Sequence, residues 1–444
     1  MKKILIIGAG RSAVCLIEYL LRASDTYGFS VTVADSDLTL AKRRVADFSN
    51  GKAMSLNILE SEQRRDTIKK HDFIISMLPA HLHMEVALDC LTFGKHLATA
   101  SYVSEGMKKL NDEIKRKNLF FLNECGLDPG IDHASAMKII DHLHDEGAVI
   151  HTFKSYCGGL VAPESNDNPW GYKFSWNPRN VILAGQGVAQ YLLNGEMRFI
   201  PYNRLFTQTE QVEVDGFGQF DAYANRDSLS YIESYQLQGV QTMLRGTLRN
   251  VGYCKAWNVF VKLGLTDDSI VFNGMKGKRF ADLLIAFLPE EGLSLKESLR
   301  KFMGIEYDSK TEEMLGYLEL FGDKVIEIDK GTPAQILQSL LEEKWKLNDH
   351  DKDMIVLKHE FGFTKNGKEG KIESSLGLLG KDNDQTAMAQ TVGLPLAICV
   401  KNFLTNKIKS TGIQIPTTKE IYIPLLAELE TFGIRFNEKK EVKE

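Results

Sequence analysis

The sequence predicts an α/β protein of more than one domain, and three observations lead to this fold class. Strands and helices alternate regularly up to about residue 130, the alternation stops near residue 131, and residues 247–345 are largely helical in pattern. A chain of 444 residues, of which 43% are hydrophobic, also exceeds what one core normally serves. We therefore expect two or three domains, the first built on a parallel sheet flanked by helices.

The N-terminal stretch KILIIGAGRSAVCLIEYLLRAS predicts a buried strand, a glycine turn and an amphipathic helix. This context makes the glycine pattern a dinucleotide-binding fingerprint. Gly8 permits the tight turn, Gly10 lets the backbone approach a pyrophosphate, and Ala13 stands where a third glycine is usual. The structural alternative is that these glycines only close a tight turn.

The second predicted strand, SVTVAD, ends at Asp35. An acidic residue at this point accepts hydrogen bonds from the adenine ribose hydroxyls and repels a 2′-phosphate. The sequence therefore predicts NAD as the cofactor, with NADP possible. The basic residues Lys42, Arg43 and Arg44 follow on the next helix, and we interpret them as its solvated face.

Further strand and helix units follow in HDFIISMLPAHLHMEVALDCLTFG, HLATASYVSEGMKKLNDEIKRKN and LFFLNECGLDPGID. Ligands of such sheets lie beyond the carboxyl ends of the strands. The candidate site residues are therefore those just after each strand: Asn57, residues 77–79, residues 100–102 and residues 124–128. His81 and His83 have no nearby carboxylate or cysteine cluster, so we predict no metal site and interpret them as polar residues at a helix start.

The alternation of strands and helices is lost in the middle of the chain. AVIHTFKSYCGG predicts a strand, and PRNVILAGQGVAQYLLNG, ADLLIAFLP and PAQILQSLLEEKWKL predict helices. DMIVLKHEFGF and GKIESSLGLLG predict two strands of a hairpin, because Asn-Gly marks the turn between them. TAMAQTVGLPLAICVKNFLTNKI predicts a final helix, followed by a charged tail.

Composition argues against several classes of partner. The net charge of −5 argues against nucleic acid or an anionic membrane surface as the main partner. No stretch approaches the roughly 18 unbroken apolar residues that a membrane span requires. The six cysteines are widely scattered, which predicts free thiols and a cytoplasmic protein.

The sequence predicts that residues 155–176, SYCGGLVAPESNDNPWGYKFSW, form a loop that is unusually rich in aromatic side chains. It carries Trp170, Tyr172, Phe174 and Trp176 among glycines and prolines. Isolated aromatics on a surface loop gain little from burial, so we expect this loop to fold over something.

Several motifs together are far more specific than the glycine fingerprint. The aromatic loop, NECGLDPGIDH, ATASYVSE, YANRDS and LRGTLR resemble the glutamate-forming saccharopine dehydrogenases over nearly the whole chain. The resemblance implies interconversion of saccharopine with glutamate and aminoadipate semialdehyde, using a nicotinamide cofactor. The aromatic loop is then expected to form one wall of the cleft that binds nicotinamide and substrate.

The resemblance also implies a domain organisation and a homodimer. We expect a variant Rossmann domain in residues 1–130 and about 385–444, and a mixed α/β substrate and dimerisation domain in residues 131–246 and about 350–384. Residues 247–349 are expected to form an all-helical domain.

The resemblance assigns roles to individual residues. Asp128, Tyr102 and Cys157 are expected at the reacting centre, and Asp128 is the first choice for orienting the substrate amine or relaying its proton. Guanidinium groups bind carboxylates well, so Arg226 and Arg245 are expected to bind the carboxylates of the substrate. The expected substrate-binding residues are Ser101, Tyr102, Asp128, Arg226, Arg245, Gly246 and Thr247. The expected cofactor-binding residues are Gly8, Gly10, Arg11, Ser12, Ala13, Asp35, Ser36, Asn57, Leu78, Pro79, Ala100, Ser101, Leu127 and Trp176.

Structural alternatives exist for each assignment. Asp128 precedes a proline and could only initiate a turn, Cys157 could be an inert core residue, and the arginines could form surface ion pairs. Two other functions stay open: a carboxyspermidine or carboxynorspermidine dehydrogenase, and a catalytically silent nucleotide-sensing protein. A carboxyspermidine or carboxynorspermidine dehydrogenase would need fewer arginines and more acidic residues to hold a polyamine. A nucleotide-sensing protein without activity would lack the residues beside the nicotinamide.

Overall fold

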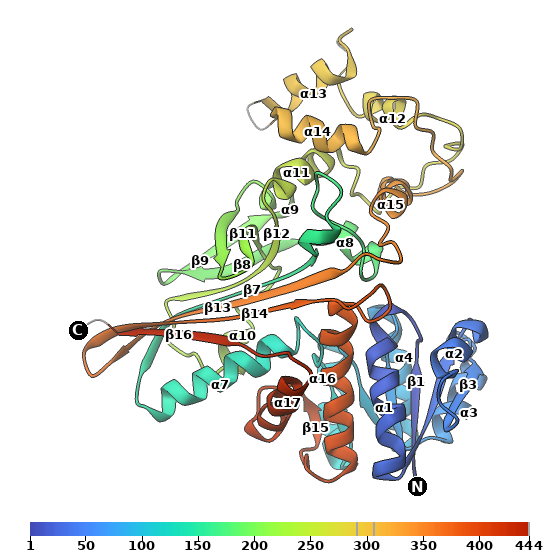
Figure 1. Cartoon of the computed structure of the whole chain (residues 1–444), viewed down its shortest axis with the longest axis vertical. Coiled ribbons are helices and arrows are strands. Elements are labelled where there is room, and N and C mark those ends of the chain that lie inside the picture. Colours follow the sequence, from blue (N-terminus) through green and yellow to red (C-terminus); the bar gives the residue numbers. More distant parts are fainter. Residues whose placement is uncertain (290–291, 305–306, 443–444) are drawn as a thin grey trace. The chain divides into compact units, whose positions relative to one another are not determined.

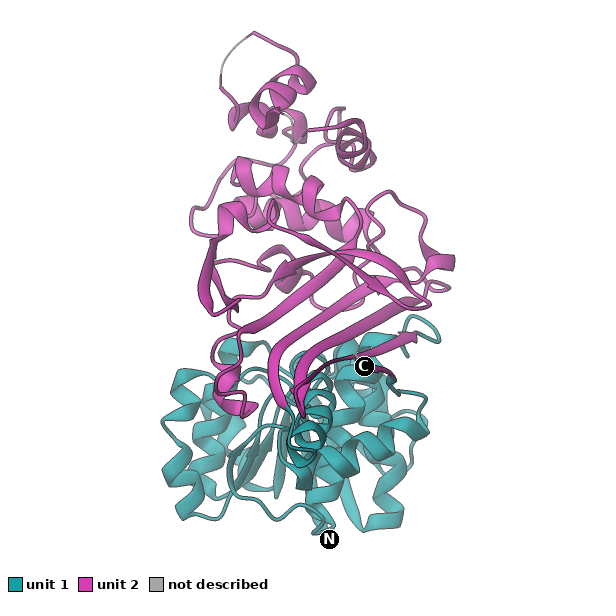
Figure 2. Cartoon of the chain, turned by 90° about the vertical axis from the view of Figure 1, so that its left-hand side faces the viewer, with its two compact units in different colours: residues 1–148, 380–437 teal, residues 149–379, 438–444 magenta. Residues whose placement is uncertain are grey.

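The structure is a computed structural model, and it describes residues 1–289, 292–304 and 307–442. The chain forms two compact units, coloured separately in Figure 2. Unit 1 consists of Met1–Ala148 and Gly380–Asn437, and unit 2 consists of Val149–Leu379 and Glu438–Glu444.

The unit boundaries differ from the predicted domain ranges. The helix after residue 130 belongs to unit 1, and the sheet and the helices of residues 253–344 share unit 2. Residues 290–291, 305–306 and 443–444 of the predicted ranges lie outside the described residues.

Unit 1 is built on a parallel seven-stranded sheet in the order β15-β6-β5-β4-β1-β2-β3, as Figure 1 shows in part. Its strands are β1 (Lys2–Ile7), β2 (Phe29–Asp35), β3 (Gly51–Ser55), β4 (Phe73–Ser76), β5 (His96–Ala98), β6 (Phe120–Leu122) and β15 (Gly412–Gln414). Its helices are α1 (Val14–Tyr27), α2 (Leu38–Val45), α3 (Ser61–Lys69), α4 (His83–Phe93), α5 (Glu105–Lys108), α6 (Asn111–Arg116), α7 (Ile131–Asp145), α16 (Ala387–Leu404) and α17 (Lys419–Thr431). The order from β3 to β6 is that of the Rossmann fold, and this confirms the predicted fold class.

The C-terminal segment completes unit 1. Strand β15 adds to the free edge of β6, and α16 packs directly on α1 (Figure 1). The approach is close because a Cβ atom at Gly393 would lie 2.8 Å from the backbone nitrogen of Leu16. By length and composition alone α16 could span a membrane, although most of it is buried inside the protein.

Unit 2 is built on a mixed nine-stranded sheet. Its main path runs β10-β11-β12-β7-β13-β14-β16, and β8 and β9 pair beside β12. The strands are β7 (Val149–Val161), β8 (Val188–Leu193), β9 (Glu196–Pro201), β10 (Glu210–Val214), β11 (Gly218–Ala224), β12 (Thr242–Asn250), β13 (Asp353–Lys365), β14 (Lys368–Leu379) and β16 (Asn437–Val442). The predicted hairpin is β13 and β14, and both turn residues, Asn366 and Gly367, have positive φ angles.

The helices of unit 2 pack partly on this sheet and partly on one another. They are α8 (Pro178–Ile182), α9 (Tyr202–Leu205), α10 (Tyr231–Ser234), α11 (Tyr253–Leu263), α12 (Phe280–Ala286), α13 (Leu295–Met303), α14 (Ser309–Tyr317) and α15 (Pro333–Lys344). The helix predicted over residues 178–195 is wrong beyond its first turns. It ends at Ile182, and Gly185 and Gly187 turn the chain into β8 with φ angles of +79° and +100°.

The loop predicted over residues 155–176 is wrong for residues 155–161, which belong to β7, and its aromatic part lies in the hydrophobic core of unit 2. Trp170, Tyr172 and Phe174 are at most 2% exposed. The Trp170 ring stacks on Phe260 of α11, and its indole nitrogen donates a hydrogen bond of 2.7 Å to the carbonyl of Met314. The expectation that this loop forms a cleft wall is therefore wrong for these three rings, because the helices after β12 offer an apolar surface that the loop covers.

Candidate active site

The glycine turn of unit 1 has the geometry that the fingerprint predicts. Gly8 has a φ angle of +103°, and a Cβ atom there would lie 2.8 Å from the carbonyl oxygen of Met77. A Cβ atom at Gly10 would meet no protein atom within 4 Å. Packing therefore explains Gly8 but not Gly10, whose missing side chain leaves the room that a pyrophosphate needs to approach the backbone. The next residues, Arg11, Ser12 and Ala13, form a single 3-10 turn that leads into α1.

Asp35 lies at the carboxyl end of β2, next to the glycine turn. Its Oδ2 atom accepts a hydrogen bond of 2.7 Å from the backbone nitrogen of Ala9. Its Oδ1 atom accepts from the backbone nitrogen of Asp37 at 3.0 Å and from the Ser36 hydroxyl at 3.3 Å. These bonds fix the carboxylate where an adenine ribose would lie, and a carboxylate can accept further bonds from the ribose hydroxyls.

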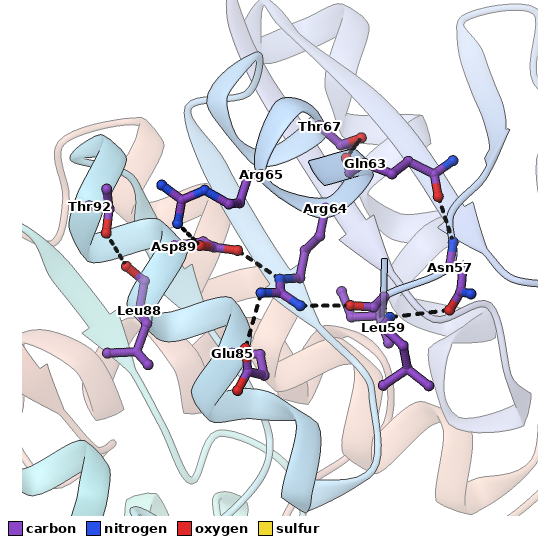
Figure 3. A network of polar contacts seen from close by, with 11 residues as sticks. Asn57, Leu59, Gln63, Arg64, Arg65, Thr67, Glu85, Leu88, Asp89 and Thr92 are labelled. Atoms are coloured by element: carbon purple, nitrogen blue, oxygen red, sulfur yellow. Dashed lines mark hydrogen bonds and ion pairs between the residues drawn. The ribbon is translucent and has the colours of Figure 1, made fainter. Parts of the chain in front are cut away.

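Asn57 follows β3 and is held in place by a polar network, shown in Figure 3. Its backbone nitrogen donates to Gln63 Oε1, and its own Oδ1 accepts from the backbone nitrogen of Leu59. Arg64 donates to the carbonyl of Ile58 and to Asp89, with bonds of 2.9 and 2.7 Å. The network therefore ties the loop after β3 to α4.

The same Asp89 carboxylate also binds a second arginine. Asp89 Oδ1 pairs with Arg65 at 2.7 Å, while Arg64 also reaches Glu85 at 3.0 Å (Figure 3). The Asp89 side chain is 3% exposed and that of Arg64 8%, so their ion pair is buried. A buried charge pair of this kind holds its loop only while both partners are present.

His83 organises the ends of β4 and β5, which are neighbours in the sheet. Its Nδ1 atom lies 2.8 Å from the Ser76 hydroxyl, and its Nε2 atom lies 2.8 Å from the Ser101 hydroxyl and 3.3 Å from that of Thr99. Burial, assisted by nearby His81, lowers the pKa of His83 to about 4, so the ring is neutral near pH 7. His83 therefore orients Ser101, one of the predicted ligand-binding residues.

Two predicted catalytic residues are in direct contact. The Tyr102 hydroxyl donates a hydrogen bond of 3.2 Å to Asp128 Oδ1. Tyr102 is 47% exposed, and Asp128 is half-buried between the buried residues Leu127 and Pro129. The loop after β5 and the loop after β6 thus bring an exposed phenol and a carboxylate together at one edge of the sheet.

Beneath this pair lies a buried network around Glu124, a residue that the sequence places among the candidates after β6 without giving it a role. Glu124 is 5% exposed, and its Oε1 accepts from the backbone nitrogen of Val103 at 2.9 Å. Its Oε2 lies 2.9 Å from His133 Nε2, and its backbone nitrogen donates to the carbonyl of Ser101. Glu124 therefore holds the segment on either side of Tyr102. Its place directly after a strand is the sequence signal for Glu124, whereas its partner His133, nine residues further on in α7, carries no such signal.

The predicted substrate residues of unit 2 lie at the end of β11 and in the middle of β12. Cys157 of β7 is paired with Thr247 of β12 across the sheet. The Thr247 hydroxyl donates a hydrogen bond of 2.7 Å to Asn225, which follows β11. The Cys157 side chain is 7% exposed. The sheet register therefore brings Cys157 and Thr247 together.

The two predicted arginines differ in their surroundings. Arg226 is exposed, and its guanidinium makes no ion pair with any residue that the structure describes. Arg245 is 2% exposed, and its guanidinium lies over the Tyr231 ring, 4.2 Å from the centroid. Gly246 is required by packing, because a Cβ atom there would lie 3.0 Å from the Tyr156 ring.

The remaining predicted cofactor residues are placed as follows. Leu78 and Pro79 follow β4, Ala100 follows β5, and Trp176 lies in unit 2. Trp176 is half-buried, and its indole nitrogen donates to the Tyr172 hydroxyl at 3.2 Å. No group of three histidine, cysteine, aspartate or glutamate side chains suited to a metal ion occurs among the residues that the structure describes.

Comparison with known proteins gives two family matches. Residues 4–122 match the model described as "Saccharopine dehydrogenase NADP binding domain". Residues 126–434 match the model described as "Saccharopine dehydrogenase C-terminal domain".

Individual relatives align over the whole of this chain. It is 34% identical to the mouse "Alpha-aminoadipic semialdehyde synthase, mitochondrial", covering 100% of this chain but 48% of that protein. It is 32% identical to the Schizosaccharomyces pombe "Saccharopine dehydrogenase [NADP(+), L-glutamate-forming]", covering 99% of both chains. The structure also superposes on apo saccharopine dehydrogenase (L-Glu forming) from Saccharomyces cerevisiae with a TM-score of 0.89 and 32% identity, covering 99% of this chain and 100% of that one.

Proposed function

Because the chain belongs to the saccharopine dehydrogenase family, we propose that it interconverts saccharopine with glutamate and 2-aminoadipate 6-semialdehyde in lysine metabolism. It would then be an oxidoreductase acting on a CH–NH group. The observation that carries the proposal is the alignment over 99% of both chains with the S. pombe saccharopine dehydrogenase. The mouse relative is about twice as long as this chain, so the activity of its other half is not carried over.

The cofactor of this reaction is a nicotinamide dinucleotide, and the glycine turn fits it. The cofactor, when bound, supplies or accepts the hydride. The open space at Gly10 and the carboxylate of Asp35 are what the pyrophosphate and the adenine ribose require. Ser101, held by His83, would bind at the nicotinamide end of the sheet.

We propose that NAD is preferred over NADP, although the S. pombe relative is named for NADP(+). The carboxylate of Asp35 would repel a 2′-phosphate at the ribose position. Ser36, the next residue, carries no positive charge that could attract one.

We assign the proton chemistry to Asp128 and Tyr102. The chemistry requires the secondary amine of the substrate to lose or regain a proton, and a half-buried carboxylate that accepts a phenol hydrogen bond is suited to that task. Tyr102 would orient the Asp128 carboxylate or exchange the proton with it. Cys157 stays a third candidate, and its burial beside Thr247 supports a structural contribution as well.

Substrate carboxylates are assigned to the arginines of unit 2. Arg226 supports the assignment best because its guanidinium is exposed and has no ion-pair partner among the described residues. Such a cationic group is also what a polyamine-binding site would avoid. This argues against the carboxyspermidine dehydrogenase alternative.

Steady-state oxidation of saccharopine with NAD and with NADP tests the proposal directly. We expect turnover with both saccharopine and a dinucleotide present, and a higher kcat/KM with NAD. An Asp35→Ala and Ser36→Arg double variant should shift the preference toward NADP. A protein that binds dinucleotides but does not oxidise saccharopine would overturn the proposed substrate, and a higher kcat/KM with NADP would overturn the cofactor preference.

We further propose that the protein works as a cytoplasmic homodimer. None of the six cysteines, all of which lie in the described part of the chain, forms a disulfide, and all six are buried, which supports a reducing compartment. We propose no nucleic acid or membrane partner, since the net charge of −5 offers little attraction to either.

A further inference from the structure

Arg43 and Arg44 of α2 share one carboxylate from a distant part of the chain. Arg43 pairs with Asp384 Oδ2 at 2.7 Å, and Arg44 pairs with Asp384 Oδ1 at 2.9 Å. Each oxygen of Asp384 thus binds one guanidinium. The side chain of Arg44 is only 9% exposed, so the interpretation of the basic residues of α2 as a solvated face is wrong for Arg44.

Arg44 lies against the glycine turn. Its Nε atom donates a hydrogen bond of 3.2 Å to the carbonyl of Ala9, whose backbone nitrogen donates to Asp35. Arg44 and Asp35 therefore flank the same residue of the turn. Since the adenine ribose lies at the end of β2 in this fold, Arg44 lies at the ribose end of the dinucleotide site.

The loop that carries Asp384 is itself fixed. Asp382 Oδ1 accepts hydrogen bonds from the backbone nitrogens of Asp384 and Gln385, at 2.9 and 2.6 Å. The Gln385 side chain donates to Glu18 of α1 at 2.9 Å. Partial burial alone would raise the pKa of Asp384, but its bonds to Arg44 and Arg43 bring the pKa below its ordinary value. The carboxylate is therefore charged near neutral pH.

We propose that Asp384 is a determinant of cofactor specificity, because it engages both guanidiniums that could otherwise attract the 2′-phosphate of NADP. The inference rests on the proposed dinucleotide-dependent function and deepens it. Asp35 disfavours the phosphate by direct repulsion, and Asp384 removes the attraction that the two arginines would exert. The positive charge of Arg43 and Arg44 at the ribose end of the site is thus balanced by Asp384, which lies far from the glycine fingerprint in the sequence.

The test compares NADH and NADPH binding to the full chain, measured as two dissociation constants by fluorescence titration. Asp384→Asn should tighten NADPH binding relative to NADH by about fivefold to tenfold, as expected for one uncompensated charge near a phosphate. Asp384→Glu keeps the charge and should keep the wild-type ratio. Replacing Arg43 and Arg44 by Gln in the Asp384→Asn background should abolish the gain.

A matched control is Asp112→Asn in α6, at the opposite edge of the sheet. It removes the same charge and should leave the ratio of the NADPH and NADH dissociation constants unchanged. An Asp384→Asn variant that binds NADH normally with an unchanged ratio would overturn this inference and leave the proposed function intact. A wild-type protein that binds neither dinucleotide would overturn both.

Discussion

Asp128 and Tyr102 are the residues on which the proposed chemistry depends. Asp128→Asn keeps the shape of the side chain and removes its charge, so we expect kcat to fall by about 10²- to 10⁴-fold, the usual contribution of a positioned acid or base. Saccharopine binding should be affected less, and the acid limb of the pH–rate profile should change. If Asp128 only stabilises the turn before Pro129, Asn serves as well, and a kcat near that of the wild type would show this.

Arg226 offers the cleaner of the two arginine tests. Arg226→Ala should raise KM for saccharopine at least about tenfold, because a carboxylate would lose a charge-assisted hydrogen bond. Arg198→Ala on β9 is a matched control, since Arg198 is also exposed and forms its ion pair with nearby Glu196. Arg245 is unsuitable, because its buried guanidinium packs on Tyr231 and its removal would also lower stability. An unchanged KM in Arg226→Ala would remove Arg226 from the substrate site.

His83 makes the stability of unit 1 depend on pH. Its pKa is about 4 in the folded chain and 6.5 in the unfolded one, so the unfolded state binds more protons between these values. The free energy of unfolding should therefore fall as the pH decreases from about 6.5 towards 4, by up to about 3 kcal/mol from this group. Urea denaturation at several pH values measures the effect. His83→Gln should show a shallower decline, and an identical pH dependence would contradict the assignment.

At the scale of elements, the buried pair of Arg64 and Asp89 connects α3, α4 and the loop after β3. Asp89→Ala leaves the Arg64 guanidinium buried without its carboxylate and should lower the free energy of unfolding by about 3 to 5 kcal/mol. Glu85→Ala removes the other, 56% exposed partner of Arg64 and should cost at most about 1 kcal/mol. Chemical denaturation measures the free energy of unfolding of both variants. An equal decrease in the two would show that burial of the ion pair does not determine how much it stabilises the protein.

Elements with a strong local signal were predictable from the sequence. The glycine turn and the hairpin of β13 and β14 depend on backbone angles that glycine and asparagine adopt readily, so their positions follow from residue type. β8 was not predictable in the same way. VAQYLL has no strict alternation, and its strand state comes from pairing with β9 and β12.

The candidate site could be predicted in part, for a related reason. The ends of parallel strands identify Asp35, Ser101, Tyr102 and Asp128 without knowledge of side-chain contacts. The role of His83 depends on β4 and β5 being neighbours, which a single sequence does not reveal. The aromatic loop was misplaced because its surroundings come from α11 and from Trp345 just after α15, which lie far along the chain.

At the scale of the whole molecule, the prediction still to be tested is the homodimer through the mixed sheet of unit 2. The β8 and β9 hairpin exposes Val188, Met197 and Phe199, which are 51%, 63% and 58% exposed. Met197 and Phe199 alternate along β9 and share one face of the hairpin. Neighbouring apolar side chains exposed in this way are typical of a protein interface.

We expect the wild-type chain to be a dimer in light scattering at micromolar concentration, and Met197→Lys with Phe199→Lys to shift it towards the monomer. Two buried lysines would have to lose their hydration at the interface, which is unfavourable unless acidic partners meet them. Ile285→Lys in α12 is the control, because Ile285 is 52% exposed but lies among the helices of residues 247–349, outside the predicted dimerisation domain. A wild-type monomer would refute the dimer itself. A dimer that survives the double substitution but dissociates with Ile285→Lys would instead place the interface on the helices.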